Sequence, residues 1–359
     1  MTIPTEPIGS IPRPQSLIDA MSAFAAGRIS AEDLQATGAD AVRDTIERFE
    51  ATGSPVITDG EQTKPSFATY PLTGLQTLDP NGVVIPFADG HTRQLPKLTA
   101  GPFHYQVYAD SYLDTAKRFA HVPVKQAVIA ASAMSLLYPD EGIPGYSRDA
   151  FVADLVNNAE ADIRRSLDHG ADSVQMDFTE GRLAVKLDPS KGVLNAFIDL
   201  NNQVLSRFSD AERQRIGVHT CPGGDRDSTH SADVDYADLL PALFKMNVHN
   251  FYVQLASEQD RARVLGIIRD SSREDQRVFV GVIDPINPRI ETPEEVRDAV
   301  LEAAEYIPLR RLGTCDDCGF SPFGDDTSTS RDTAFAKISA RIAGTRMAEE
   351  KLGAGAASS

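Results

Sequence analysis

Residues 215–221 read Arg-Ile-Gly-Val-His-Thr-Cys, a short apolar run that ends in side chains able to bind a metal. The run is typical of a buried strand, and seven further candidate strands are spread along the chain. They lie near residues 6–10, 55–60, 124–130, 173–178, 250–256, 277–284 and 309–314. Near-continuous apolar strands are typical of a parallel sheet that is covered on both faces.

Helical patterns lie between these candidate strands. One helix is expected to begin after Ser30, with Asp33 three residues further on, and another to run from Ser147 to a C-capping Gly170. Thr292-Pro293-Glu294-Glu295 has the form of a capping box with proline at the first helical position. Eight strands alternating with helices predict an α/β fold of one kind, a single (β/α)8 TIM barrel. A doubly wound sheet competes, but the sequence has no Gly-rich dinucleotide-binding loop.

The stretch 65–105 is too long for an ordinary loop of such a barrel. Its turn signals, Asp79-Pro80-Asn81-Gly82 and Asp89-Gly90, flank short apolar runs, so we expect a β-hairpin excursion after the second strand. We expect residues 1–352 to form one catalytic domain, with the last helix running from about Arg331 to Leu352. The small and polar residues 353–359 are expected to form a disordered tail.

Composition narrows the classes of partner. The 359 residues carry a formal net charge of −17, which disfavours binding to nucleic acid or to anionic membranes. No apolar run reaches the length of a membrane span, and the first residues lack the pattern of a secretory signal, so we expect a cytoplasmic protein. Three cysteines are too few for a disulfide framework, and the oligomeric state stays open.

The cysteines gather at one predicted face, where strands pass into the loops that carry chemistry in such barrels. His219 and Cys221 alternate along one strand, so their side chains point the same way. Together with Cys315 and Cys318 they offer up to four nitrogen and sulfur ligands, the set that Zn²⁺ prefers. The alternatives are a redox pair of Cys315 and Cys318, or cysteines that only fill the core.

Five segments in order along the chain resemble the catalytic domain of cobalamin-independent methionine synthase and its relatives, which include the epoxyalkane:coenzyme M transferases. These segments are Ile8-Gly9-Ser10 with Pro12-Arg13, Asp59-Gly60-Glu61, Gln175-Met176-Asp177, Val218-His219-Thr220-Cys221 and Asp317-Cys318-Gly319. The resemblance implies a barrel whose zinc binds the sulfur of a thiol substrate. Zinc would stabilise the thiolate, which is the form that attacks carbon.

The resemblance also implies roles for individual residues. His219, Cys221 and Cys318 match zinc ligands, and Ser10, Glu61 and Asp177 match positions that hold the amino and carboxylate groups of homocysteine. The remaining zinc ligand of the family is usually a glutamate on the sixth strand. The best register places Gln254 there; a slip would reach Glu258, and Cys315 is a further candidate for this ligand.

The expected activity is transfer of an alkyl group, most simply methyl, from a small donor to a small-molecule thiol. Asp284 is a candidate general acid for the leaving group, or alternatively a partner of His219. The single barrel and the absence of tryptophan point away from the folate-dependent reaction, although Tyr138 could replace the tryptophan that stacks near the pterin in the folate enzymes.

Two alternatives remain open. One is opening of an epoxide by zinc-bound coenzyme M, whose sulfonate would need cations such as Arg13, Lys64 and Arg182. The other is a barrel that binds zinc or a thiol without turnover.

Overall fold

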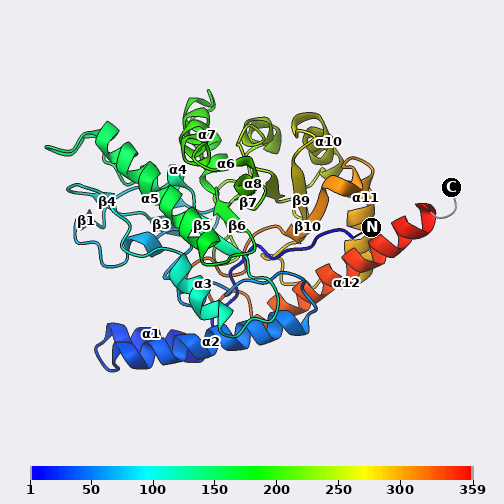
Figure 1. Cartoon of the computed structure of the whole chain (residues 1–359), viewed down its shortest axis with the longest axis horizontal. Coiled ribbons are helices and arrows are strands. Elements are labelled where there is room, and N and C mark those ends of the chain that lie inside the picture. Colours follow the sequence, from blue (N-terminus) through cyan, green and yellow to red (C-terminus); the bar gives the residue numbers. More distant parts are fainter. Residues whose placement is uncertain (1, 357–359) are drawn as a thin grey trace.

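A parallel sheet of six strands forms the centre of the computed structural model, which describes residues 2–356 (Figure 1). Its order is β10-β9-β8-β7-β6-β5, so strands that are consecutive in the chain are neighbours in the sheet. The strands are β5 (Gln126–Ile129), β6 (Val174–Asp177), β7 (Ile216–Thr220), β8 (Asn250–Val253), β9 (Arg277–Ile283) and β10 (Leu312–Asp316). All but the first residue of β9 are buried, as expected for a sheet that is covered on both faces.

The other two expected strands are not strands. The segment near 6–10 is attached to β10 by a single bridge between Thr5 and Thr314, and the segment near 55–60 is attached to β5 by a bridge between Ile57 and Val124. Prolines at positions 4, 7 and 55 remove backbone N–H donors, which prevents a continuous ladder. The two segments contact each other through the Thr58 hydroxyl, which donates to the carbonyl of Gly9 at 2.8 Å.

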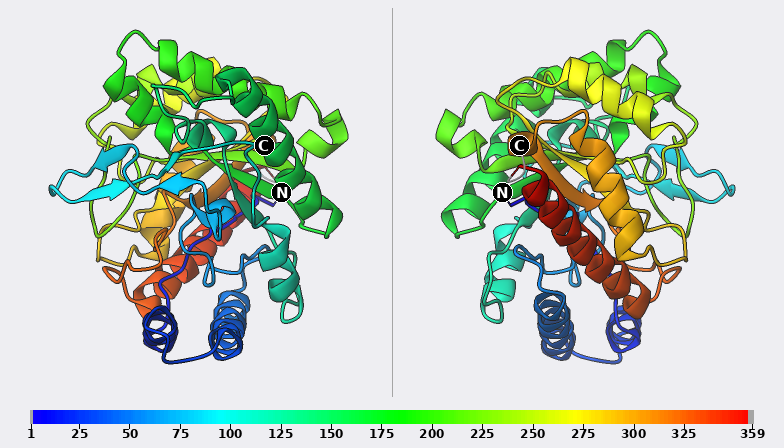
Figure 2. Two further views of the ribbon diagram at one scale, coloured as in Figure 1. Left: turned by 90° about the vertical axis from the view of Figure 1, so that its left-hand side faces the viewer. Right: turned by 90° about the vertical axis from the view of Figure 1, so that its right-hand side faces the viewer.

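Helices surround the sheet in the two side views (Figure 2). The expected helices are present, because capping boxes at Ser30 and Thr292 begin α2 and α11, and the Ser147 side chain caps α5. The helices are α1 (Gln15–Ala25), α2 (Ala31–Ala51), α3 (Asp110–Lys117), α4 (Ala131–Ser135), α5 (Arg148–Asp168), α6 (Glu180–Leu187), α7 (Gly192–Leu205), α8 (Asp210–Arg213), α9 (Leu240–Leu243), α10 (Arg261–Ser271), α11 (Pro293–Ala304) and α12 (Arg331–Ala356). Short 3-10 helices are η1 (Tyr70–Leu72), η2 (Tyr236–Asp238) and η3 (Leu309–Arg311).

The excursion over residues 65–105 contains the expected hairpin. It pairs β2 (Val84–Pro86) with β3 (Thr92–Gln94) in antiparallel register, beside a shorter pair formed by β1 (Leu78–Asp79) and β4 (Lys97–Leu98). The hairpin turn is held against the loop that follows β7, because Ala88 N–H donates to the carbonyl of Thr229 at 2.9 Å. The excursion therefore brings side chains to the end of the sheet where β7 finishes.

The C-terminal helix α12 extends to Ala356, beyond the expected end at Leu352, and residues 357–359 of the expected tail lie outside the described residues. None of the helices in the described part of the chain is long and apolar enough to cross a membrane.

A buried ion pair joins α12 to the end of β10. Arg341 Nη1 lies 2.6 Å from Asp316 Oδ2, and the side chain of Arg341 is fully buried. Within residues 2–356, Arg341 Nε and Nη2 have no hydrogen-bond partner. The charge of the guanidinium is therefore compensated by one carboxylate. Removing that carboxylate destabilises the folded protein by more than the ion pair stabilises it, because a buried charge is left without a partner.

Replacing Asp316 with asparagine should lower the free energy of unfolding by about 3–5 kcal/mol, because it leaves a buried cation uncompensated. The double variant Asp316→Asn with Arg341→Met should recover most of that loss. Urea denaturation followed by circular dichroism measures both. The control is Asp298→Asn, which removes a similar charge from an exposed pair with Arg297 and should leave the midpoint nearly unchanged. Equal midpoints for Asp316→Asn and the control would contradict this assignment.

Candidate metal and substrate site

Three potential metal ligands meet where the strands end. His219 lies in β7, Cys221 is the first residue after the end of β7, and Cys318 comes two residues after the end of β10. The possible ligand atoms of these three residues all lie within 4.8 Å of one another. The sulfur atoms of Cys221 and Cys318 are 3.0 Å apart, and both cysteines are free and buried. Strands β7 and β10 are separated by two strands in the sheet, so the sheet curves enough for their carboxyl ends to converge.

The electrostatics of this cluster favour a bound cation. The hydrogen bond with Cys318 and the nearby His219 hold the pKa of the Cys221 thiol well below its usual value. Burial would lower the pKa of His219, but the Cys221 charge raises it overall. Both ring nitrogens of His219 are buried without a hydrogen-bond partner among the described residues. A buried imidazole with no partner beside two thiols is a donor set that fits a zinc ion.

Asp317 positions Cys318. Its carboxylate accepts four hydrogen bonds from the loop after β8: from the N–H groups of Leu255, Ala256 and Ser257, each at 2.8 Å, and from the Ser257 hydroxyl at 2.7 Å. Burial raises the pKa of Asp317 to about 7, although these donors act in the opposite direction. A Cβ on Gly281 would stand 1.8 Å from Asp317 Oδ1, so only glycine fits beneath this carboxylate.

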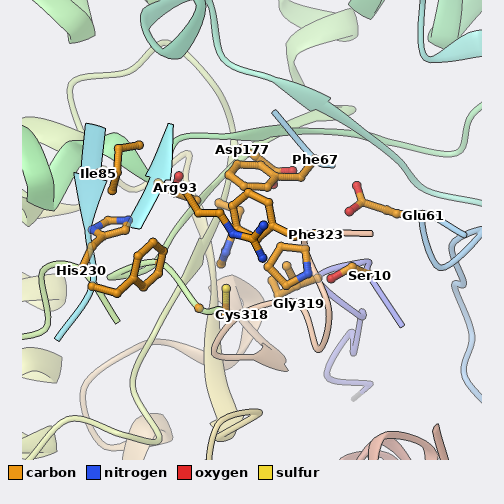
Figure 3. Close-up of a pocket in the computed structure, with 17 residues that line it drawn as sticks. Ser10, Glu61, Phe67, Ile85, Arg93, Asp177, His230, Cys318, Gly319 and Phe323 are labelled. Carbon is orange, nitrogen blue, oxygen red and sulfur yellow. The ribbon is translucent and has the colours of Figure 1, made fainter. Parts of the chain in front are cut away.

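His219 and Cys318 line a small cavity of about 70 Å³ together with three residues expected to bind substrate, namely Ser10, Glu61 and Asp177 (Figure 3). Asp177 Oδ1 accepts a hydrogen bond from Gln175 at 2.8 Å. Burial, and then the charge of Glu61, raises the pKa of Asp177 to about 7. Because the charge of Glu61 disfavours ionisation of Asp177, a positively charged group would bind well beside Asp177.

Glu61 and Ser10 are held by their neighbours. Glu61 has a left-handed backbone, with φ of 56°, and its N–H donates to Asp59 at 2.9 Å. Its carboxylate accepts from Lys64 at 3.0 Å. Ser10 Oγ accepts from the N–H of Ser321 at 3.1 Å, and a Cβ on Gly319 would stand 2.1 Å from that oxygen. The glycine of the Asp-Cys-Gly segment therefore lets Ser10 approach the metal cluster.

The three cationic side chains considered for binding a sulfonate have other partners. Arg13 donates only to backbone carbonyls, and Lys64 pairs with Glu61 and donates to the carbonyl of Ala127. The carbonyl partners of Arg13 belong to Glu61, Gln62, Lys64, Ser321 and Phe323. Arg182 donates to Gln254, Glu258 and the carbonyl of Val234. None of the three lines the small cavity.

Two further candidates for the metal lie outside the cluster. Cys315 is buried in a small apolar cluster with Ile8, Tyr252 and Phe279, and its thiol donates to the carbonyl of Phe279 at 3.4 Å. Gln254 accepts from Arg182 and donates to Ser257 at 2.6 Å. The three-ligand cluster contains neither of them. Cys315 does not join the cluster because side chains alternate in direction along β10, and this alternation directs the Cys315 side chain into the core.

Asp284 and Tyr138 lie away from the small cavity. Asp284 lines a larger cavity of about 610 Å³ on another side of Cys318, and its Oδ1 accepts the N–H of Ile286 at 3.0 Å. Tyr138 donates to the carbonyl of Tyr146 at 2.7 Å and packs against Phe151. The phenylalanine rings that line the small cavity belong to Phe67, Phe87 and Phe323.

Sequence reasoning missed what the excursion contributes. Arg93 of β3 and His230 of the loop after β7 line the small cavity, with Ile85 of β2 beside them (Figure 3). Arg93 is paired with the carboxylates of Asp225 and Asp325 at 2.5 Å and 2.9 Å. For Arg93 and Ile85 the only signal in the sequence was the length of the excursion, because nothing local shows that a hairpin after residue 65 returns over the end of β7.

Comparison with known proteins gives the family. Residues 104–331 match the model of the cobalamin-independent synthase catalytic domain, which is more than half of the chain. The chain is 25% identical over 351 residues to the methionine synthase of Sulfurisphaera tokodaii, covering 98% of this chain and 94% of that protein. It is 22% identical over 322 residues to the methionine synthase of Pyrococcus furiosus, covering 88% of this chain and 86% of that protein.

Solved structures agree on the fold. A B12-independent methionine synthase from Shewanella sp. W3-18-1, solved with selenomethionine, superposes with a TM-score of 0.77 at 21% identity and covers 99% of this chain and 100% of that chain. A putative vitamin-B12 independent methionine synthase from Listeria monocytogenes gives a TM-score of 0.69 at 20% identity, covering 96% and 98%. With the match to the family model extending from residue 104 to residue 331, the chain belongs to the cobalamin-independent synthase catalytic domain family.

Proposed function

We propose that this protein is a zinc-dependent methyltransferase that transfers a methyl group to the thiol of homocysteine, giving methionine. The observation that carries the proposal is one cavity lined both by His219 and Cys318 and by Ser10, Glu61 and Asp177. A metal-binding cluster can activate a thiol, and two carboxyl groups can hold an ammonium group near it.

His219, Cys221 and Cys318 would hold the zinc ion. When bound, zinc lowers the pKa of a coordinated thiol, so that the thiolate is available at neutral pH. The residues of the chain prepare that state: Asp317 fixes Cys318 through the loop after β8, and the unpartnered imidazole of His219 is free to coordinate. A catalytic zinc keeps one position open, so three protein ligands suit this role without a fourth from Gln254 or Cys315.

The charges around the cavity favour homocysteine over coenzyme M as the thiol. A sulfonate needs free cations, but Arg13, Lys64 and Arg182 are paired with carbonyls or carboxylates, and Arg93 is paired with Asp225 and Asp325. An ammonium group needs a carboxylate, and Asp177 lines the cavity without an ion-pair partner among the described residues, whereas Glu61 lines it while paired with Lys64.

The two extended segments at the edges of the sheet fit a closed eight-position barrel. One segment is bridged to β10, the other to β5, and Thr58 links them, so together they can complete the ring. We propose that residues 1–352 act as one catalytic domain of this kind, with Asp284 as a candidate general acid that faces the larger cavity.

Zinc content tests the ligand assignment. The purified protein should contain about one zinc per chain by plasma mass spectrometry, and Cys221→Ser or Cys318→Ser should lose the metal and the transfer activity, because zinc sites with three protein ligands depend on each of them. Cys315→Ser is the matched control, and it should keep both since Cys315 lies in the core. Loss of zinc in the control with retention in Cys318→Ser would refute the assignment.

Thiol selectivity tests the charge argument. Homocysteine should bind the zinc-loaded protein at least about tenfold more tightly than 2-mercaptoethanesulfonate, because its ammonium gains charge-assisted hydrogen bonds that the sulfonate cannot make. Isothermal titration calorimetry gives both affinities. Tighter binding of the sulfonate, together with consumption of an epoxide, would favour the coenzyme M reaction instead. Tight binding of homocysteine without turnover of any methyl donor would indicate a binding protein.

Asp177 is expected to hold the ammonium group of homocysteine. Asp177→Asn should weaken homocysteine binding about ten- to a hundredfold while the zinc content stays at the wild-type level, since the loss of a charged partner costs about 1.5–3 kcal/mol. Asp284→Asn is the matched control, because it removes a carboxylate that lines the other cavity. Equal affinities in the two variants would contradict the role of Asp177.

A further inference from the structure

We propose that a second cavity beside the thiol site holds the leaving group of the alkyl donor, and that Glu180 gives a proton from its Oε2 to the heteroatom of that group. The inference rests on the proposed function, because it concerns the donor side of the same transfer. It names both the chemical class of the donor, an uncharged and mainly apolar molecule, and a catalytic residue.

The second cavity has a volume of about 260 Å³ and shares one wall with the thiol site. Six residues line both spaces: Phe67, Ile85, Arg93, Thr179, His230 and Phe323. The remaining wall is largely apolar, with Leu95, Ile129, Ala133, Leu136 and Leu183. A molecule in this space would have its reactive end directed towards the thiol and its body surrounded by hydrocarbon and aromatic rings.

Apart from Glu180, the charged side chains that line the cavity are paired. Arg93 is paired with Asp225 and Asp325, and Asp225 is fully buried in that pair. Burial lowers the pKa of His230 to about 4, so its imidazole is neutral at pH 7. An uncharged occupant therefore avoids the desolvation penalty that an ionic donor would incur in this space.

One carboxylate oxygen of Glu180 has no partner in the described part of the chain. Glu180 lines the second cavity at the start of α6, is 6% exposed, and its Oε2 has no hydrogen-bond partner within residues 2–356. The Nδ1 of His230, on the wall between the two spaces, is also without a partner there. Buried polar atoms of this kind normally have partners, which points to a ligand that supplies them.

Hydrogen-bond directions place the proton of Glu180. The amide of Asn201 can only donate to Ser132 Oγ, which it does at 2.7 Å. The Ser132 hydroxyl in turn donates to Glu180 Oε1. Because Oε1 is an acceptor, a neutral Glu180 carries its proton on Oε2, the oxygen that has no partner in the protein. Burial raises the pKa of Glu180 to about 7, so the neutral acid is well populated at neutral pH.

The step balances without another reactant. The sulfur of the thiolate forms a bond to the alkyl carbon as the bond from that carbon to the donor's nitrogen or oxygen breaks. That heteroatom takes the bonding electron pair and the proton of Glu180 Oε2, and it leaves as a neutral molecule. The carboxylate of Glu180 is then reprotonated by the proton that the next thiol releases on binding. A general acid with a pKa near the working pH suits this role.

A neutral mimic of the leaving group tests the proposal without turnover. 1-Methylbenzimidazole has an apolar bicyclic body and one ring nitrogen that can only accept a hydrogen bond. It should bind the zinc-loaded enzyme at about pH 6 and lose about tenfold in affinity for each pH unit above about 7, since deprotonation of Glu180 removes the donor. Calorimetric titrations from about pH 6 to about pH 9 measure this.

Variants separate Glu180 from the other ionisable groups that line the cavity, which are His230, Arg93 and Asp325, and from Asp177, whose charge acts on Glu180. Glu180→Gln should bind the mimic with little dependence on pH, because its amide still donates a hydrogen bond but does not titrate. Leu183→Phe, which fills the cavity, should abolish binding of the mimic, and Asp298→Asn, which changes an exposed carboxylate that lines neither cavity, should behave like the wild type.

Three results would overturn the proposal: affinity independent of pH in the wild type, unchanged pH dependence in Glu180→Gln, or no binding of the mimic. Zinc content and homocysteine affinity are measured on the same samples of Glu180→Gln and should equal those of the wild type. If the wild type itself lacks zinc or homocysteine binding, the proposed function fails, whereas the cavity is still judged by the mimic.

Discussion

The carboxylate of Asp317 is the constraint on which the site depends. It accepts four hydrogen bonds from residues 255–257, after β8, and its own N–H donates to the carbonyl of Ile283, at the end of β9. These hydrogen bonds connect the ends of three neighbouring strands, β8, β9 and β10, at the point where the backbone hydrogen bonds of the sheet end. Cys318 is the next residue after Asp317, so the same hydrogen bonds fix its position, and its sulfur contacts the sulfur of Cys221. Gly281 and Gly319 are required by the same arrangement, one beneath the carboxylate and one beside Ser10.

Buried acids set the chemistry around this metal cluster. Burial raises the pKa of both Asp177 and Glu180 to about 7, yet their surroundings differ. Asp177 shares its cavity with Glu61 and the metal cluster, where a cationic group relieves the repulsion between the carboxylates. Glu180 faces a largely apolar space, which favours the neutral form of its carboxyl group. In the proposed function, one end of the parallel sheet would thus hold both the ammonium group of the thiol substrate and the uncharged donor.

The sequence was sufficient wherever local chemistry decides the structure. Capping residues at Ser30 and Thr292 correctly predicted two helices, and the His-x-Cys and Asp-Cys-Gly segments correctly predicted that three potential metal ligands lie at one face. Predictions from the sequence failed where missing backbone N–H donors or contacts between distant segments determine the structure. Prolines reduced the first two expected strands to single bridges, and strand alternation directed Cys315 into the core. The positions of Arg93 and His230 depend on how a hairpin of the excursion packs on the loop after β7, which no local pattern encodes.

The central claim is that a homocysteine thiol becomes a ligand of a zinc ion held by His219, Cys221 and Cys318. X-ray absorption at the zinc edge tests it most directly, because sulfur and nitrogen or oxygen neighbours of zinc lie at different distances. Without substrate, the account predicts two sulfur neighbours and at least one nitrogen neighbour. Addition of homocysteine should raise the number of sulfur neighbours to three. A sulfur count that does not change, in protein shown to have bound homocysteine, would contradict the account.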